Sequence, residues 1–240
     1  MEEQEKNVIW YYLRGPGLIC LCALVFFFGS RIGRESGSIA VSGSGENSRL
    51  GEPLQKTGQT AVLTFETVYG GEQTEKILDI LTAHQIRAVF FVTGQWAEQY
   101  PETVKRIVRE GHKIGSCGEN GKNMSGLSPE AIKEELETSG RKLERLTGVS
   151  PTLFRPPCGT YSSILLEIAE KMGYTCIWWD VDSEDWKDYV PASITAAVVE
   201  NPQLKNGSVI RLHSGTKYTA EALEGVICGL QEKGYDLTPD

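Results

Sequence analysis

The residues best suited to chemistry lie in the C-terminal third of the chain, where an acidic segment is followed by a Leu-His pair. The segment is Asp182-Ser183-Glu184-Asp185-Trp186, and the pair is Leu212-His213. A histidine held by a carboxylate can protonate a departing amine near neutral pH. Taken alone, however, the acidic residues are better explained as a solvated loop. Their meaning therefore depends on the other motifs of the chain.

Three further motifs precede this segment. One is a loop in which two prolines keep the backbone out of a helix. Two others lie nearer the N-terminus, each at the end of a predicted strand. In chain order the three motifs are Thr64-Phe65-Glu66-Thr67-Val68-Tyr69, with Thr74 further along; Gly111-His112-Lys113-Ile114-Gly115-Ser116-Cys117-Gly118-Glu119-Asn120-Gly121; and Arg155-Pro156-Pro157-Cys158-Gly159.

In this order the motifs resemble those of the polysaccharide deacetylases, the NodB-homology proteins of carbohydrate esterase family 4. The resemblance covers residues 60–238. The last three motifs are kept. The first two align without a gap but depart from the family's Thr-Phe-Asp-Asp-Gly-Pro and Gly-His-Glu-Ile-Gly-Asn-His-Thr-x-x-His. The family removes acetyl groups from N-acetylated sugars of peptidoglycan or chitin-like chains, and is thus a hydrolase of non-peptide C–N bonds.

The resemblance implies roles for the kept residues of the C-terminal motifs. His213 would be the general acid and Asp185 the carboxylate that orients it. Trp186 would line the pocket that holds the acetyl group, helped by Leu212. Together with Arg155, the residues Asp185, Trp186 and His213 would form the acid and pocket side of a deacetylase site.

The resemblance also assigns a catalytic base and its neighbours. Glu66 stands where the family has the aspartate that acts as general base, and Arg155 would contact that base. Cys158 replaces the usual Tyr whose backbone N–H helps to stabilise the oxyanion. A backbone donor survives a change of side chain, so this contribution is compatible with cysteine.

The metal positions of the family are all changed in this chain. The metal-binding Asp corresponds to Thr67, and the two metal-binding His correspond to Cys117 and Gly121. Thr offers no anionic oxygen and Gly offers no side chain. His112 belongs to the structural Gly-His lead-in and is not a ligand. The family uses a divalent metal such as zinc, and we expect none here.

Length and composition limit the classes of protein that the chain can represent. Its 240 residues suffice for one sizeable core after a tail is set aside. The net charge of -8, spread along the chain, argues against a nucleic-acid partner. The spacing of its six cysteines matches no zinc module. Cys117 and Cys158 occupy motif positions that converge in the family, which suggests a disulfide, a thiolate metal site or two unrelated buried cysteines.

The N-terminal region predicts a membrane anchor. Residues 18–28 are continuously apolar, and the uncharged stretch of residues 15–30 is shorter than the roughly 20 residues that a bilayer span prefers. A tilted helix including residues 10–14 would suffice, with Arg14 reaching a headgroup. The alternative is a cleaved signal peptide. We favour a cytoplasmic tail and single-pass signal anchor at residues 1–31, a Gly/Ser-rich linker at 32–59 and an extracytoplasmic domain at 60–240.

The folded domain is predicted to be of the α/β class. Strands are expected at residues 61–65, 88–93, 113–116, 153–155, 175–179 and 208–212, and helices at 72–84, 97–110 and 129–148, with others between the later strands. Strands that alternate with helices indicate parallel βαβ units, and their number suggests a distorted (β/α) barrel of the NodB-homology type. The site of such folds lies at the carboxyl ends of the strands.

Three functions remain open from the sequence. The leading hypothesis is a membrane-anchored deacetylase homologue that has lost metal-dependent catalysis and binds cell-wall or other N-acetylated glycans. The second is an active hydrolase with a rebuilt or metal-independent site. The third is a structural or signalling ectodomain that uses the fold as a scaffold.

Overall fold

The computed structural model describes residues 58–237. The predicted signal anchor and nearly all of the predicted linker lie outside these residues. Within residues 58–237, no helix is both long enough and apolar enough to span a bilayer.

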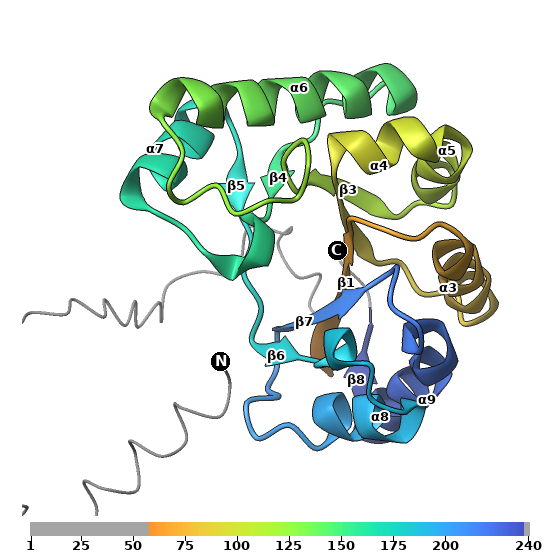
Figure 1. Ribbon diagram of the computed structural model, residues 1–240. Coiled ribbons are helices and arrows are strands. Elements are labelled where there is room, and N and C mark those ends of the chain that lie inside the picture. Colours follow the sequence, from red (N-terminus) through yellow and green to blue (C-terminus); the bar gives the residue numbers. More distant parts are fainter. Residues whose placement is uncertain (1–57, 238–240) are drawn as a thin grey trace, which may run out of the picture. The chain divides into compact units, whose positions relative to one another are not determined.

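Strands and helices alternate along most of the described chain, except that α4 is followed by α5 and β5 by β6 (Figure 1). The strands are β1 (Gln59–Thr67), β2 (Val89–Val92), β3 (Lys113–Ser116), β4 (Leu153–Phe154), β5 (Thr175–Cys176), β6 (Val181–Asp182), β7 (Ser208–His213) and β8 (Tyr235–Asp236). The helices are α3 (Glu72–Ala83), α4 (Gly94–Gln99), α5 (Pro101–Arg109), α6 (Pro129–Thr147), α7 (Ser163–Lys171), α8 (Pro191–Val199) and α9 (Thr219–Glu232), with 3-10 turns η1 (Pro157–Gly159) and η2 (Asp185–Lys187).

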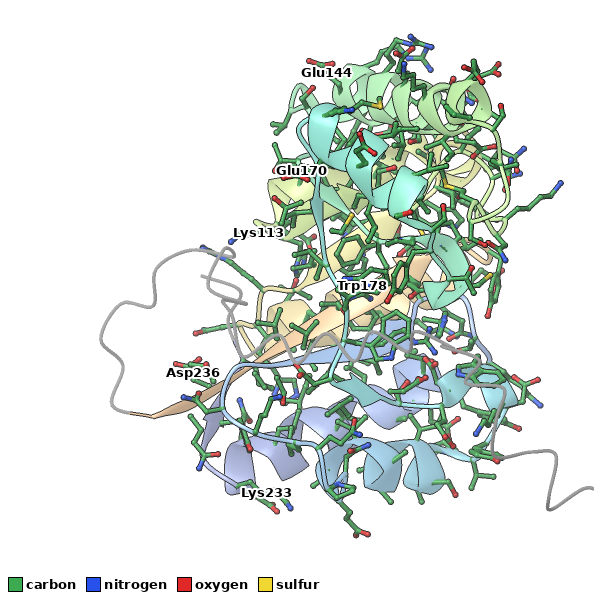
Figure 2. The ribbon with its side chains drawn as sticks, turned by 90° about the vertical axis from the view of Figure 1, so that its left-hand side faces the viewer. Lys113, Glu144, Glu170, Trp178, Lys233 and Asp236 are labelled. Atoms are coloured by element: carbon green, nitrogen blue, oxygen red, sulfur yellow. The ribbon has the colours of Figure 1, made fainter. Side chains whose placement is uncertain are left out.

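The described strands form one eight-stranded sheet, and the pairings between them are parallel. Its order is β5-β4-β3-β2-β1-β7-β6, with β8 paired to β1. Residues 177–180 run directly from edge strand β5 to the opposite edge strand β6. Trp178 marks this crossover in Figure 2, between the half of the domain that carries α6 and α7 and the half that carries α8 and α9. The sheet is therefore a curled half-barrel, in agreement with the predicted barrel class.

The strands bury both faces because helices cover the outside and the curled sheet encloses the inside. On β1, Leu63 and Phe65 belong to the large core that the strands share with helices such as α3 and α9. The alternate residue Val62 belongs to a separate small cluster with Val89, Phe91 and Cys117. Side chains of a strand alternate between its two faces, so Glu66 shares the inner face with Val62.

Local sequence signals explain several element boundaries. The side chain of Ser128 accepts a hydrogen bond from the Ala131 N–H and caps α6, Pro129 occupies its first turn, and Gly148 ends it at φ +74°. The single helix predicted at residues 97–110 is wrong. The structure has two helices, α4 and α5, because Pro101 holds Tyr100 outside the helical region at φ -128°, ψ 57°.

Candidate active site

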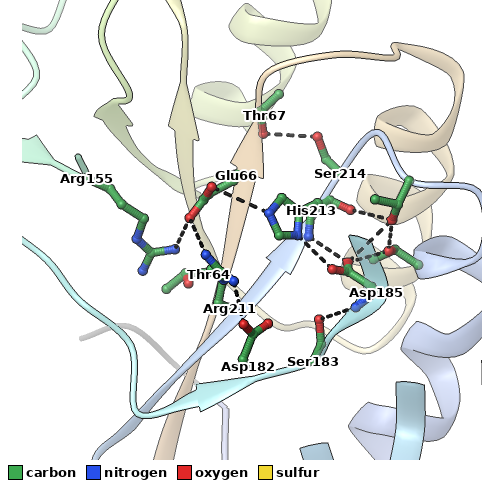
Figure 3. Close-up of polar contacts among 12 residues, drawn as sticks. Thr64, Glu66, Thr67, Arg155, Asp182, Ser183, Asp185, Arg211, His213 and Ser214 are labelled. Carbon is green, nitrogen blue, oxygen red and sulfur yellow. Dashed lines mark hydrogen bonds and ion pairs between the residues drawn. The ribbon is translucent and has the colours of Figure 1, made fainter. Parts of the chain in front are cut away.

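Three side chains form a continuous polar array at the carboxyl ends of β1 and β7 (Figure 3). His213 Nδ1 lies 2.7 Å from Asp185 Oδ1, and His213 Nε2 lies 3.5 Å from Glu66 Oε2. The backbone N–H of His213 also donates to Asp185 Oδ2 at 2.7 Å. The imidazole is therefore held between two carboxylates, and all three side chains are buried.

The fold positions these groups through strand register and a tight turn. Glu66 and His213 are direct partners in the β1–β7 ladder, so their side chains emerge at the same height. Asp185 lies in η2, immediately after β6, where Glu184 adopts the left-handed conformation. Asp185 Oδ2 also accepts a hydrogen bond of 2.5 Å from Thr219 at the start of α9. The carboxylate is thus fixed from both β7 and α9.

Electrostatics favour the ionised form of every member of the array. Burial lowers the pKa of His213, but its hydrogen bonds and charge interactions with Asp185 and Glu66 dominate and raise it to about 9. Burial raises the pKa of Asp185 and of Glu66. In both cases the hydrogen bonds and charges of the surrounding groups, with His213 foremost, together outweigh burial and hold the pKa below its ordinary value, and Arg155 adds to this effect at Glu66. Near neutral pH, His213 is an imidazolium between two carboxylates.

Arg155 lies entirely inside the curled sheet, as its predicted contact with the base requires. Its Nη1 is 3.8 Å from Glu66 Oε1, and its exposed fraction is 0%. Its Nε and Nη2 donate to the carbonyls of Ile177 and Trp178 at 3.3 and 3.4 Å, and its guanidinium lies 4.2 Å from the ring centre of Phe91. Burial lowers the pKa of Arg155 to about 10, which leaves it charged. Arg155 therefore links the base position to the β5–β6 crossover.

Arg211 is a second cation of the site that the sequence analysis missed. Its Nη1 lies 3.8 Å from Glu66 Oε1, its Nη2 forms an ion pair with Asp182, and its guanidinium stacks 3.8 Å from the ring centre of Trp179. Arg211 precedes His213 by two positions on β7, so strand alternation places both on the inner face. This two-residue spacing from His213 is the sequence signal that identifies Arg211 as a residue of the site. Glu66 is thus surrounded by two arginines and a protonated histidine.

The position of the family's metal-binding Asp is part of a chain of hydroxyl groups. Ser214 donates to Thr67 at 3.1 Å and accepts from Thr74 at the same distance. All three residues have 0% exposure. The chain joins β1, α3 and the residue after His213 without any charged group. Thr67 is therefore engaged as a neutral hydrogen-bond partner.

The two positions of the family's metal-binding His offer no usable ligand pair. Cys117 is buried with Val62, Val89 and Phe91. Burial, reinforced by the charge of Glu66, raises the pKa of its thiol well above the ordinary value, so the metal-binding thiolate is disfavoured. Gly121 has φ +70°, and a Cβ there would lie 2.6 Å from Val68 Cγ1. Within residues 58–237, no three or more His, Cys, Asp or Glu side chains are grouped to hold a metal ion. These residues do not fit the divalent metal of the family.

The remaining predicted site residues differ in their surroundings. Trp186 in η2 is 50% exposed and so is accessible to a ligand. Leu212 is fully buried in the outer core, on the opposite face of β7 from His213. Cys158 is exposed and sits in η1 at φ 60°. The substrate contacts predicted for these three residues stay predictions.

No cysteine within residues 58–237 is paired in a disulfide. Cys117 and Cys158 are both free thiols, one buried and the other exposed. The suggested bridge between them is therefore not present in this structure.

A cavity of about 660 Å³ lies beside β6 and α8. Its lining includes Trp179, Asp180, Asp182 and Glu184. Asp182 and Trp179 both contact Arg211, so the cavity adjoins the site through that arginine. Neither Glu66 nor His213 lines it, and we therefore assign the cavity no part in the chemistry of the array.

Comparisons with known proteins agree with this fold and site. Residues 54–177 match the family model of polysaccharide deacetylases. The chain is 35% identical over 173 residues to the uncharacterised protein YlxY of Bacillus subtilis, which covers 72% of this chain and 53% of YlxY. It is 31% identical over 188 residues to the peptidoglycan-N-acetylmuramic acid deacetylase PdaA of Bacillus subtilis, with coverages of 78% and 70%.

Among solved structures, the chain resembles a CE4 family pseudoenzyme from Bacillus anthracis with a TM-score of 0.72 and 30% identity, over 76% of this chain and 64% of that one. A mutant of a CE4 family pseudoenzyme with restored enzymatic activity matches equally well in TM-score and identity. The fold and site define a parallel α/β half-barrel with a buried Asp-His-Glu array. The chain belongs to the polysaccharide deacetylase family. It spans only about half the length of YlxY.

Proposed function

We propose that this chain is a membrane-anchored, extracytoplasmic polysaccharide deacetylase homologue that binds N-acetylated glycans of the peptidoglycan type and has lost metal-dependent catalysis. The observation that carries the proposal is the contrast within one site. The Asp185–His213–Glu66 array is complete, whereas Thr67, Cys117 and Gly121 offer no set of metal ligands. In the family the metal polarises the carbonyl and activates water, an effect worth several kcal/mol.

Glycan binding is supported by the parts of the site that remain accessible. Trp186 presents a half-exposed ring beside the buried array, and aromatic rings are common platforms for apolar ring faces. Relatives named as peptidoglycan deacetylases, such as PdaA, support the choice of a cell-wall glycan as the ligand.

The membrane anchor and the extracytoplasmic location rest on the N-terminal sequence. Residues 18–28 form an apolar run ahead of a Gly/Ser-rich stretch, which is typical of a signal anchor followed by a tether. A cell-wall ligand agrees with that location because peptidoglycan lies outside the cytoplasmic membrane. Separation of membrane and soluble fractions, with a protease-accessibility assay on intact cells, tests both points.

A second candidate function is a hydrolase that works without the family metal. It is favoured by the array itself, because a protonated His213 can serve as general acid while Glu66 is an ionised carboxylate that can accept a proton from water. Against it, both arginines and the imidazolium hold the Glu66 carboxylate, which makes it a weaker base than a free glutamate.

One experiment separates these functions. The purified full chain is mixed with insoluble peptidoglycan, and bound protein is measured after sedimentation in the presence of increasing N-acetylglucosamine oligomer. We expect binding that the oligomer competes away and that Trp186→Ala weakens by roughly tenfold, about 1.4 kcal/mol. Val149→Ala, which shortens an equally exposed apolar residue just beyond the C-terminus of α6, is the control and should bind normally.

The other outcomes each favour a different function. Absence of glycan binding contradicts the proposal and favours a structural or signalling ectodomain. Stoichiometric zinc in the purified chain, together with release of acetate that His213→Ala abolishes, contradicts the loss of metal-dependent catalysis. Release of acetate that chelation does not change favours the metal-independent hydrolase.

A further inference from the structure

Val68 is a side chain of the inner cluster that neither candidate function uses. It follows β1 directly and packs against the buried cluster of Val62, Val89, Phe91 and Cys117. The backbone of Gly121 faces it. A Cβ at Gly121 would lie 2.6 Å from Val68 Cγ1 and 3.2 Å from the methyl group of Thr93. Val68 thus occupies the space next to one of the family's metal positions.

This contact cannot be relieved by a small adjustment. Non-bonded carbon atoms prefer separations of about 3.5–4.0 Å, so 2.6 Å is a deep overlap. Val is branched at Cβ and has few χ1 alternatives, and Val68 is partly buried against the cluster. Thr93 is fixed because its side chain accepts a hydrogen bond from the Trp96 N–H at the start of α4. Both side chains that a Cβ at residue 121 would meet are therefore held in place.

We infer that Val68 is a steric plug that closes the metal position at Gly121. While Val68 is present, no side chain at residue 121 fits, and a histidine there is excluded. The three missing ligand side chains are therefore not the only obstacle to metal binding at this site. Recovery of a metal centre requires the removal of Val68 together with Thr67→Asp, Cys117→His and Gly121→His.

The steric part is tested by the melting temperature of full-chain variants. Gly121→Ala adds a Cβ against Val68 and also places alanine at φ +70°. Gly148→Ala is the matched control, because Gly148 has φ +74° with open space around its Cβ position. We expect Gly148→Ala to lower the melting temperature by about 4 °C from backbone strain alone, and Gly121→Ala to lower it at least twice as far.

Removal of Val68 should reduce the difference between the two glycine sites to what the 3.2 Å contact with the Thr93 methyl group leaves. In a Val68→Gly background, Gly121→Ala should lower the melting temperature clearly less than it does in the wild-type background. Val68→Ala, which also removes Cγ1, replaces Val68→Gly if that variant does not fold. The inference is overturned if Gly121→Ala equals Gly148→Ala in the wild-type background, or if loss of Val68 leaves the extra fall unchanged.

The metal part is tested by zinc content measured after dialysis, without reference to activity. The triple variant Thr67→Asp, Cys117→His, Gly121→His is compared with the same variant carrying Val68→Gly. We expect the triple variant to retain essentially no zinc and the quadruple variant to retain about one ion per chain. Equal zinc content in the two variants, whether full or absent, overturns the inference.

Discussion

The two halves of the candidate site are supported in opposite ways. The half around His213 is charged, with each carboxylate balanced by a cation within 3.8 Å. The half around Thr67 is neutral and is filled by hydroxyl groups and apolar side chains. Both halves lie at the ends of neighbouring parallel strands. The difference shows that two halves of one candidate site can be stabilised in different ways, one by paired charges and the other by hydroxyl groups and apolar packing.

This separation is possible because each half has its own supports. Asp185 is held by the His213 N–H and by Thr219, neither of which depends on the metal positions. Thr67 is held by Ser214 and not by any charged group. Glu66 lies between the two halves, and its cationic neighbours belong to the first half. Experiments on the charged half and on the neutral half can each test this contrast.

The largest effect is expected from the removal of the most deeply buried charge. Arg155→Met should lower the free energy of unfolding by about 3–5 kcal/mol, because it leaves a buried carboxylate short of a cation and two carbonyls of the crossover without donors. Urea unfolding measures the change. Arg141→Met, on an exposed face of α6, is the control and should stay within about 0.5 kcal/mol of wild type. A loss below about 1 kcal/mol for Arg155→Met would show that Glu66 does not depend on this cation.

The next effect is a pH dependence of stability that belongs to the charged half alone. The pKa of His213 is raised by its partners to about 9, so protonation of His213 stabilises the fold most below its unfolded pKa of about 6.5. That stability is lost as pH rises through about 9. The free energy of unfolding should therefore fall by about 3 kcal/mol between about pH 6.5 and 9.5. Urea titrations at a series of pH values measure this fall.

Two neighbouring aspartates provide matched variants for this pH dependence. Asp185→Asn removes the carboxylate on His213 Nδ1 and should flatten the dependence. Asp182→Asn removes a carboxylate that pairs with Arg211 and does not contact His213, so the dependence should persist. An equal slope in both variants would contradict the assignment of this proton to His213.

The comparison also shows what the sequence predicts and what it does not. The order of the motifs and the rule that strand ends converge were enough to bring Glu66, Arg155, Asp185 and His213 together. The limits of α6 followed from Ser128 and Gly148, whose effects are local. Arg211 was missed although its position on β7 gave a signal. The two-residue period of a strand places Arg211 on the same face of β7 as His213.

The neutral half was harder to predict because its state depends on contacts between distant segments. The sequence shows that Gly121 lacks a ligand, but it does not show that Val68 fills the space beside it. The hydrogen bonds from Ser214 to Thr67 and from Thr74 to Ser214 likewise join residues from different elements. The sequence shows which side chains stand at these positions, whereas only the packing shows what surrounds them.

A smaller effect is expected on the neutral half. Thr67→Val removes the acceptor of the Ser214 hydroxyl while keeping the shape of the side chain, and should lower the free energy of unfolding by about 1 kcal/mol. In a Ser214→Ala background the same substitution should have little effect, because its partner is already absent. Urea unfolding of the four proteins in this double-mutant cycle gives the coupling. Additive losses would mean that the hydroxyl chain does not support the site.

The smallest expected effect is the response to metal, and it tests the neutral half most directly. A zinc ion bound only by the folded chain, at about a hundred times its dissociation constant, adds about 2.7 kcal/mol of stability. For a domain of this size that corresponds to a rise of roughly 5–10 °C in melting temperature. We expect zinc and chelator each to shift the melting temperature of the full chain by less than about 1 °C, because Thr67, Cys117 and Gly121 provide no ligand set. A large rise with zinc that Cys117→Ala abolishes would mean that the buried thiol ionises to bind metal. The charged half and the neutral half would then belong to one metal-binding site.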